Sequence, residues 1–256
     1  MVPPGDVQLL VAHPGHELLL HGWIGLVKPV VHVVTDGSGH TGEGRLEMTA
    51  EFVRACGARA GAIFGALSDR AAYQMILACN TTLLLWLVTK LAAAIAYRPD
   101  LIVVDAVEGY NPVHDLCRMI AGAAIEMAGV DTKLYEYAVV DRPDAFDSNS
   151  GDVIAIDLDD AEHARKIGRA RRAAGRVPDI DELLARHGAA AYRSERLRRV
   201  VDWWRIDDGG ALPLYERLGE QRVAAKRYHS VIRRDDHMIP LRDSLRRAVE
   251  ERSCAF

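Results

Sequence analysis

Short apolar runs alternate with longer amphipathic stretches along the first two thirds of the chain. Continuous runs rich in valine, leucine and isoleucine are typical of strands buried on both faces of a sheet. We predict strands at residues 7–12, 29–35, 62–64, 101–105, 134–140 and 153–158. We predict helices at residues 17–27, 45–56, 81–97, 112–127 and 159–174. Repeated strand–helix units indicate an α/β fold with a mainly parallel sheet between two layers of helices.

The last third of the chain is more charged and lacks such apolar runs. Its periodicity predicts helices at residues 179–187 and 194–205 and a mostly helical tail at residues 215–251. No internal repeat or linker interrupts it. We therefore expect a single domain over residues 1–256. It would have a Rossmann-like α/β core at about residues 5–175 and a helical C-terminal extension at about residues 176–256.

Composition narrows the classes of protein that remain. The 256 residues are 49% hydrophobic, which excludes a disordered or fibrous chain. A formal net charge of −4 argues against a nucleic-acid partner. The four cysteines are widely spaced and form no Cys-x-x-Cys pair, and the first residues carry no basic, cleavable leader. We expect reduced thiols and a cytoplasmic protein.

Residues 81–97 form the most apolar helix of the chain. The run is too short to cross a bilayer comfortably, and Lys90 interrupts it. Asn80 stands where a helix N-cap is expected. We predict a helix buried in the core or in an interface and no membrane contact, and such a helix is compatible with a homo-oligomer.

Residues that commonly bind metals follow three of the predicted strands. His13 and His16 come after the first strand, Asp36 and His40 after the second, and Asn111, His114 and Asp115 after the fourth. The carboxyl ends of parallel strands meet at one edge of a sheet, where ligands bind. Neutral imidazole is a ligand for zinc and related metals, and three ligands leave one coordination position open.

These residues carry a family resemblance. The segment AHPGHE at residues 12–17 resembles the AHPDDE motif of PIG-L/LmbE-type N-deacetylases. Three later segments, VVTDGSGHTG, EGYNPVHD and AIDLDDAEHARKIGRA, resemble the family's second strand and loop, its GYHPDH segment and its lysine-bearing helix. The order and spacing of these motifs match over roughly residues 5–175. The resemblance implies an LmbE-like fold and a zinc-dependent amidase.

Position by position, the resemblance implies a metal bound by His13, His16 and His114. The second of these replaces a carboxylate ligand of the family. Gly15 stands where the family has its general base, and Asn111 stands where it has a histidine that assists as an acid or an oxyanion donor. The resemblance therefore implies that the metal ligands survive and that the acid–base pair does not.

A centre with three neutral imidazoles carries one more positive charge than one with a carboxylate ligand, which favours hydroxide at zinc near neutral pH. Asn111 could donate a hydrogen bond to an oxyanion. Asp36, His40 and Asp115 are the candidates for proton transfer, and Glu17 ranks below them.

We therefore predict a divergent zinc hydrolase that cleaves an N-acyl group from an amino sugar or a related small metabolite. Two alternatives stay open: a non-hydrolytic metalloenzyme in which the three histidines bind Fe²⁺ or another divalent transition metal, and a non-catalytic ligand-binding relic. The G-x-G-x-x-G pattern of Gly37, Gly39 and Gly42 also allows a dinucleotide site. Against that site, the loop follows the second strand, and no acidic residue ends a strand about 20 residues later.

Overall fold

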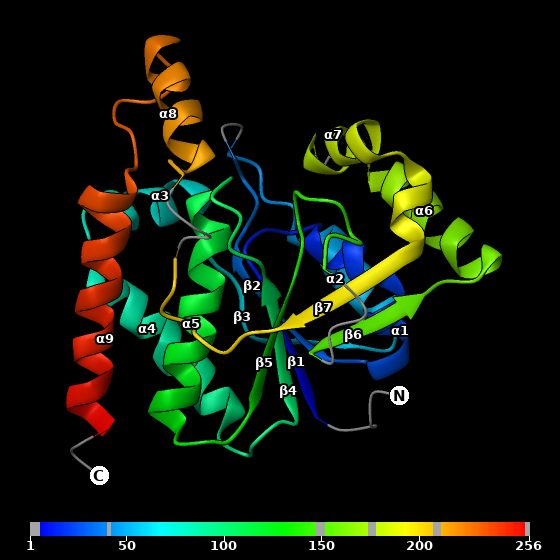
Figure 1. Ribbon diagram of the computed structural model, residues 1–256, viewed down its shortest axis with the longest axis horizontal. Coiled ribbons are helices and arrows are strands. Elements are labelled where there is room, and N and C mark those ends of the chain that lie inside the picture. Colours follow the sequence, from blue (N-terminus) through cyan, green and yellow to red (C-terminus); the bar gives the residue numbers. More distant parts are fainter. Residues whose placement is uncertain (1–5, 40–41, 147–151, 174–177, 207–210, 254–256) are drawn as a thin grey trace.

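The computed structural model describes residues 6–39, 42–146, 152–173, 178–206 and 211–253 (Figure 1). The strands are β1 (Val7–Val11), β2 (Val30–Thr35), β3 (Arg59–Leu67), β4 (Leu101–Asp105), β5 (Lys133–Tyr137), β6 (Val153–Asp157) and β7 (Ser194–Arg199). The α-helices are α1 (His21–Val27), α2 (Leu46–Ala55), α3 (Asp69–Leu77), α4 (Thr81–Ile95), α5 (Pro112–Ala128), α6 (Asp160–Ala173), α7 (Pro178–His187), α8 (Leu214–Ala224) and α9 (Ile239–Ser253). Two short 3₁₀ helices, η1 (His16–Leu20) and η2 (Ala189–Arg193), and a π-helical turn, η3 (Arg234–Met238), complete the described elements.

The seven strands form one sheet in the order β3-β2-β1-β4-β5-β7-β6. Strands β1 to β5 are parallel, and β7 runs antiparallel to both β5 and β6. The predicted α/β fold with a mainly parallel sheet is confirmed. The chain builds outward from β1 through β2 to β3 and then returns to place β4 on the other side of β1. The carboxyl ends of β1 and β4 therefore form a topological switch point, where open α/β sheets bind ligands.

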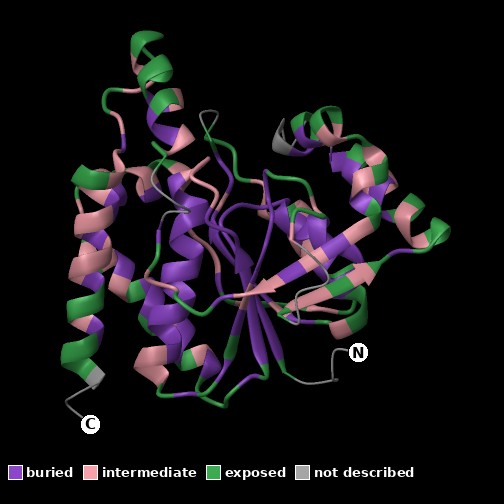
Figure 2. Cartoon of the chain, viewed as in Figure 1, coloured by how far each residue is buried: buried purple, intermediate pink, exposed green. Residues whose placement is uncertain are grey.

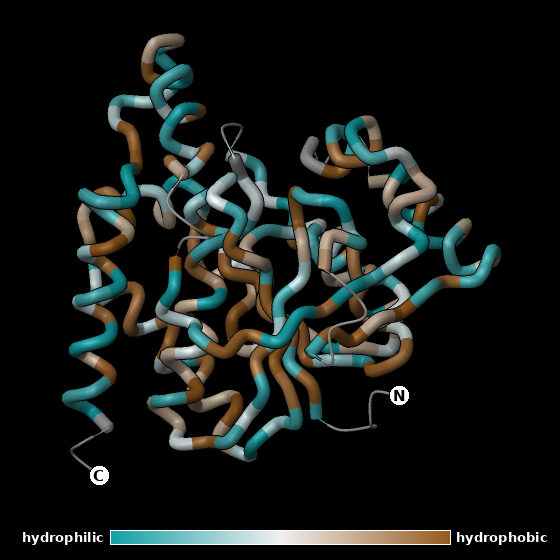
Figure 3. Tube along the Cα trace, in the orientation of Figure 1, coloured by the Kyte–Doolittle hydropathy of each residue, from teal (hydrophilic) through white to brown (hydrophobic). Residues whose placement is uncertain are grey.

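A hydrophobic core lies on each face of the sheet. One core packs α3, α4, α5 and α9 against alternate residues of the strands, and the other packs η1, α1, α2, α6 and α7 against the opposite face. Burial is greatest in the central strands and in α5, and the same strands are the most apolar segments (Figures 2 and 3). Strands buried on both faces explain the continuous apolar runs of the sequence.

The apolar helix α4 lies in the first core, as predicted for a buried helix. Its Leu84, Leu87 and Leu91 are fully buried, whereas Trp86 on its outer face is 42% exposed. The Asn80 side chain accepts a hydrogen bond from the Leu83 N–H and caps the helix. Within the described part of the chain, every helix falls short of the length and apolar character that crossing a bilayer requires.

The prediction of a helix at residues 194–205 is wrong, because residues 194–199 form β7. Buried Glu195 and Leu197 alternate with partly exposed Arg196 and Arg198, which is the two-residue period of a strand. The period was not recognised in the sequence because the charged Glu195 occupies a buried position, where an apolar residue is expected. Its carboxylate is buried because it accepts hydrogen bonds from Lys166 Nζ and from two N–H groups at the start of α1.

Strand β3 is longer than predicted, and its pairing with β2 is irregular around His32. The fully buried His32 ring accepts a hydrogen bond from the Ile63 N–H and bonds Gln8 through its other nitrogen. Gly61 makes room for the ring, since a Cβ at that position would lie 2.4 Å from the His32 ring. The His32 side chain thus takes the place of a backbone hydrogen bond between β2 and β3.

The C-terminal segment covers the α4–α5 layer, in agreement with the predicted helical tail. Helix α9 packs against α4 and α5, and α8 projects from the top of the view in Figure 1. Trp203 and Trp204 both donate their indole N–H to Glu126 of α5. Their rings pack against the core, and Trp203 lies directly on Gly122.

Candidate functional site

The residues singled out in the sequence meet at the carboxyl ends of the parallel strands. His13 follows β1, His16 begins η1, and His114 lies in the first turn of α5, after β4. The three ring centres are 4.5 Å, 5.2 Å and 5.4 Å apart. All three side chains are buried, with exposures of 7%, 1% and 3%. The fold therefore brings together the three histidines that the sequence predicts to share a site.

His13 is oriented through its Nδ1 atom. This atom lies 2.7 Å from Thr35 Oγ1 and 3.0 Å from Asp69 Oδ1. Thr35 uses its own proton for the Ala12 carbonyl, so both neighbours of Nδ1 accept hydrogen bonds. His13 therefore carries its proton on Nδ1. Burial pushes the pKa of Asp69 up, but the hydrogen bond and attraction from His13 outweigh it and keep the pKa well below its usual range.

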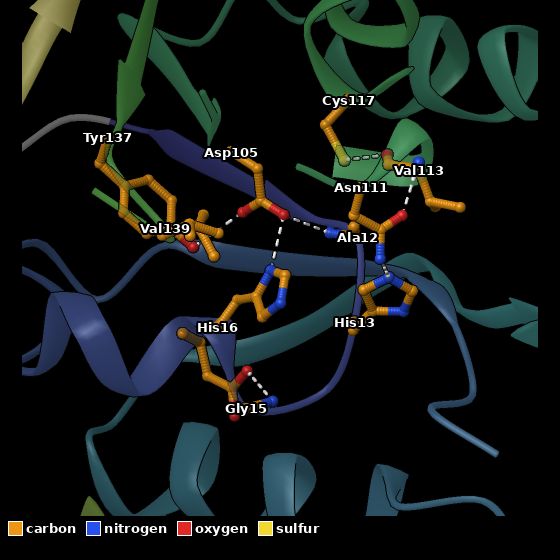
Figure 4. A network of polar contacts seen from close by, with 12 residues as sticks. Ala12, His13, Gly15, His16, Asp105, Asn111, Val113, Cys117, Tyr137 and Val139 are labelled. Carbon is orange, nitrogen blue, oxygen red and sulfur yellow. Dashed lines mark hydrogen bonds and ion pairs between the residues drawn. The ribbon is translucent and has the colours of Figure 1, made fainter. Parts of the chain in front are cut away.

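His16 is oriented by a buried carboxylate at the end of β4. Its Nδ1 lies 2.7 Å from Asp105 Oδ2, and that oxygen also accepts the Ala12 N–H at 2.9 Å (Figure 4). The Tyr137 hydroxyl donates to Asp105 Oδ1 at 2.8 Å. Asp105 thus joins β1, η1 and β5, and it holds the proton of His16 on Nδ1.

Both ring nitrogens of His114 are buried. Neither nitrogen has a hydrogen-bond partner among the described residues. Burial lowers the pKa of this imidazole well below its usual value, and the nearby His16 and His13 lower it further. A buried neutral imidazole with two unsatisfied nitrogens is costly unless a ligand satisfies it.

Gly15 has a backbone conformation that side chains rarely adopt. Its φ is 108°, in the left-handed region, and its N–H donates to Glu17 Oε2 at 2.8 Å. The other Glu17 oxygen accepts from the Thr49 hydroxyl. Burial raises the pKa of Glu17, although these hydrogen bonds oppose the shift. Glu17 stabilises the turn between His13 and His16, and both oxygens of its fully buried carboxylate accept hydrogen bonds from the protein.

Asn111 lies between α5 and His13. Its Oδ1 accepts the Val113 N–H at 2.9 Å and caps the helix, while its Nδ2 lies 3.2 Å from His13 Nε2. The sequence identified Asn111 as a group able to donate a hydrogen bond at the centre. In this structure that donor faces a histidine.

The three proposed proton carriers differ in their surroundings. Asp115 is buried, and its Oδ1 accepts the N–H groups of Glu108 and Gly109. Asp36 is half-buried and accepts the Ser38 N–H within its own loop. His40 lies outside the described residues. The geometry thus gives Asp115 a role in shaping the loop before α5.

Glu108 joins the loops that follow β4 and β5. Its carboxylate accepts the N–H groups of Val139, Val140 and Asp141. Burial raises its pKa to about 7, with these hydrogen bonds opposing the rise. Glu108 therefore titrates near neutrality beside the site.

The glycine-rich loop packs onto the turn that carries His13. Gly37 has φ 69°, and a Cβ there would lie 2.9 Å from Pro14. The Gly39 N–H donates to Asp69 Oδ2 at 2.5 Å. This N–H therefore bonds a protein carboxylate, whereas a dinucleotide loop would direct such groups to phosphate.

Sequence reasoning missed four residues that orient the histidines: Thr35, Asp69, Asp105 and Tyr137. Asp105 did leave a signal, because an acidic residue ends the otherwise apolar run LIVVD. Asp69 follows the N-cap Ser68 at the start of α3, a helix that the sequence analysis did not predict. Thr35 and Tyr137 end buried strands and carry no signal that separates them from core residues.

Comparison with known proteins supports the fold. No family model matches the chain, and no curated protein matches its sequence. Among solved structures, the deacetylase Dbv21, which acts on the pseudoaglycone of the antimicrobial A40926, is 15% identical with a TM-score of 0.53. The match covers 78% of this chain and 98% of Dbv21. A triple mutant of a deacetylase from the teicoplanin biosynthetic pathway is 13% identical with a TM-score of 0.48, over 77% of this chain and 99% of that one. At such identities a likeness shows the fold alone, and the chain has the fold of the A40926 pseudoaglycone deacetylase.

Proposed function

We propose that this protein is a divergent metal-dependent hydrolase of the PIG-L/LmbE type, which removes an N-acyl group from an amino sugar or a related small metabolite. The observation that carries the proposal is the meeting of His13, His16 and His114 at the switch point of the sheet. The shared fold with a pseudoaglycone deacetylase supports the choice of deacylation among the reactions such a centre could perform.

The residues present fit a divalent metal in their chemistry. A tetrahedral ion at about 2.0–2.1 Å from three imidazole nitrogens would place the ring centres about 5 Å apart. The observed separations of 4.5–5.4 Å agree with that spacing. Two of the imidazoles donate their other N–H to a carboxylate, which is the usual support of a metal-bound histidine. One of the two unsatisfied nitrogens of His114 would gain a partner.

The fit is not complete in its geometry. No three His, Cys, Asp or Glu side chains of the described residues already stand in the arrangement of a finished metal site. Zinc would supply Lewis acidity to an amide carbonyl and to water, and Fe²⁺ or another divalent transition metal would suit three neutral nitrogens as well.

Proton transfer is the weak part of this centre. Gly15 offers no carboxylate, and an aspartate introduced there would be strained at φ 108°. Asp69 and Asp105 are committed to orienting histidines, and Asp115 is committed to backbone N–H groups. Of the proton carriers predicted from the sequence, Asp36 and His40 remain candidates for protonating the departing amine. We therefore expect slow turnover of simple N-acetylglucosamine substrates.

A separate polar hollow lies at the same edge of the sheet, where β6 ends and β7 begins, and none of the three histidines lines it. It measures about 350 Å³ and is lined by Arg142, Asp144, Asp157, His187, Ala190, Ala191, Arg193 and Ser194. The strand β7, which begins at this hollow, lies three strand positions from β1, or about 14 Å. In the lining of the hollow, the Arg142 guanidinium pairs with the Asp144 carboxylate.

Metal analysis tests the proposal. The purified protein should hold about one equivalent of zinc, and His16→Ala should lose it, whereas His229→Ala, at an exposed histidine of the tail, should keep it. The zinc-loaded protein is then assayed for amine release from N-acylated amino sugars and glycosides. Unchanged metal content in His16→Ala would overturn the three-histidine site.

The nature of the metal separates the alternatives. Iron or copper in an oxygen-sensitive protein would favour a non-hydrolytic reaction at the same centre. Loaded protein that binds substrates but releases no amine would favour a non-catalytic role.

A further inference from the structure

The Asn111 amide lies against the Nε2 atom of His13. Asn111 is the N-cap of α5, and its Oδ1 accepts the Val113 N–H at 2.9 Å. This bond fixes the orientation of the amide plane. The Nδ2 group must therefore point away from the helix, where it lies 3.2 Å from His13 Nε2 (Figure 4).

The hydrogen bonds of His13 determine which atom donates. Two acceptors, Thr35 Oγ1 and Asp69 Oδ1, surround Nδ1, so the ring proton lies there. Nε2 consequently has a lone pair, and it accepts the Asn111 N–H. A lone pair engaged in this bond is not available to a metal.

We propose that Asn111 is an amide latch on His13, and that it sets the metal affinity of the centre because a metal must displace its N–H group to bind. The inference rests on the proposed three-histidine site. In this role Asn111 limits metal loading, in addition to any hydrogen bond it could donate to a substrate.

The helix cap makes the latch stiff. Rotating the amide away from His13 would also break the bond from the Val113 N–H, so the latch cannot open without loss at the start of α5. A net hydrogen bond corresponds to a change of roughly three- to tenfold in an equilibrium constant. We expect the latch to weaken metal binding by about that factor.

Two substitutions at Asn111 test the latch, with matched controls at Asn80. Asn111→Ser keeps a side-chain oxygen for the helix cap but is too short to reach His13. Asn111→Asp keeps the cap and the shape, and it replaces the N–H donor by an anionic oxygen. Asn80 is the exposed N-cap of α4, where its side chain accepts the Leu83 N–H, so Asn80→Ser and Asn80→Asp make the same changes away from the histidines.

The measurement is the dissociation constant for Zn²⁺ alone, from competition with a chromophoric chelator, with Co²⁺ absorption as a second probe. Asn111→Ser should bind Zn²⁺ about three- to tenfold more tightly than the unmodified chain, and Asn111→Asp more than tenfold more tightly. Both Asn80 variants should bind as the unmodified chain does. The latch is overturned if Asn111→Ser binds Zn²⁺ no more tightly than the unmodified chain, including the case in which neither binds.

A second readout follows the latch directly. In ¹⁵N-labelled protein, Zn²⁺ should move the side-chain amide signals of Asn111 to the positions of an amide released from a ring nitrogen, and leave those of Asn80 in place. Amide signals of Asn111 that stay in place in the zinc-loaded protein would also overturn the latch. Failure of the three-histidine site is seen separately, as unchanged metal content in His16→Ala.

Discussion

Asp105 is the residue on which the arrangement of the histidine centre most depends. Its carboxylate is fully buried and accepts three hydrogen bonds, from the Ala12 N–H at 2.9 Å, His16 Nδ1 at 2.7 Å and the Tyr137 hydroxyl at 2.8 Å. Asp105→Ala would leave all three donors buried without their acceptor. Each unsatisfied buried donor costs about 1–3 kcal/mol.

The sum of these costs decides the outcome for Asp105→Ala. Three such donors give about 3–6 kcal/mol after partial relaxation, against a total stability of about 5–15 kcal/mol for a typical domain. Asp105→Asn keeps one acceptor oxygen for Ala12 and His16 and can offer its amide to the Tyr137 oxygen. We expect that change to cost only about 1–2 kcal/mol, because a charge-assisted bond to His16 becomes a neutral one.

Urea unfolding of the chelator-treated protein, followed by circular dichroism, measures both variants. Asp131→Ala, at an exposed aspartate, serves as the control and should stay within about 0.5 kcal/mol of the unmodified chain. Zn²⁺ affinity gives a second readout, since losing the carboxylate partner of a ligand histidine typically weakens metal binding about 10–100-fold. If Asp105→Ala loses no more stability than Asp131→Ala, the buried carboxylate does not hold the site together.

Three further outcomes follow from the structure. Gly61→Ala should destabilise the protein by about 1–3 kcal/mol in urea titration, because its Cβ would lie 2.4 Å from the His32 ring. The control Gly25→Ala, at a helical position with nothing within 4 Å, should stabilise the protein by about 0.5–1 kcal/mol. Equal effects of the two substitutions would contradict the packing around His32. Burial raises the pKa of Glu108 to about 7 from about 4.3 in an unfolded chain, so the folded state binds this proton more tightly, and stability should fall as the pH rises from about 4 to 7, by on the order of 2–3 kcal/mol. Glu108→Gln should remove that part of the pH dependence in unfolding titrations, and an unaltered pH profile would refute it. Calorimetric titration with NAD or NADP should show no micromolar binding, because the Gly39 N–H is already bonded to the Asp69 carboxylate. Micromolar affinity for either nucleotide would instead support a dinucleotide site in this loop.

The sequence alone determined the layers of this fold. Strands buried on both faces must be apolar throughout, so β1, β2 and β4 could be recognised as continuous runs, and the helices between them imply a parallel sheet. The same reasoning failed at β7. There a buried Glu195 replaces an apolar residue, and only the partner Lys166, 29 positions earlier, explains why a charge can lie inside.

The sequence also indicated which histidines would meet, because parallel strands end at one edge of the sheet. The tertiary structure decided how they are held. Asp69, Asp105 and Tyr137 come from three different elements, and their roles depend on hydrogen bonds across 32–89 positions of the chain. Local patterns reveal burial and periodicity, which are properties of neighbouring residues. The His13 nitrogen that carries a lone pair is determined by hydrogen-bond partners that are distant in the sequence and that only the folded chain brings within about 3 Å. A local sequence pattern does not contain this information.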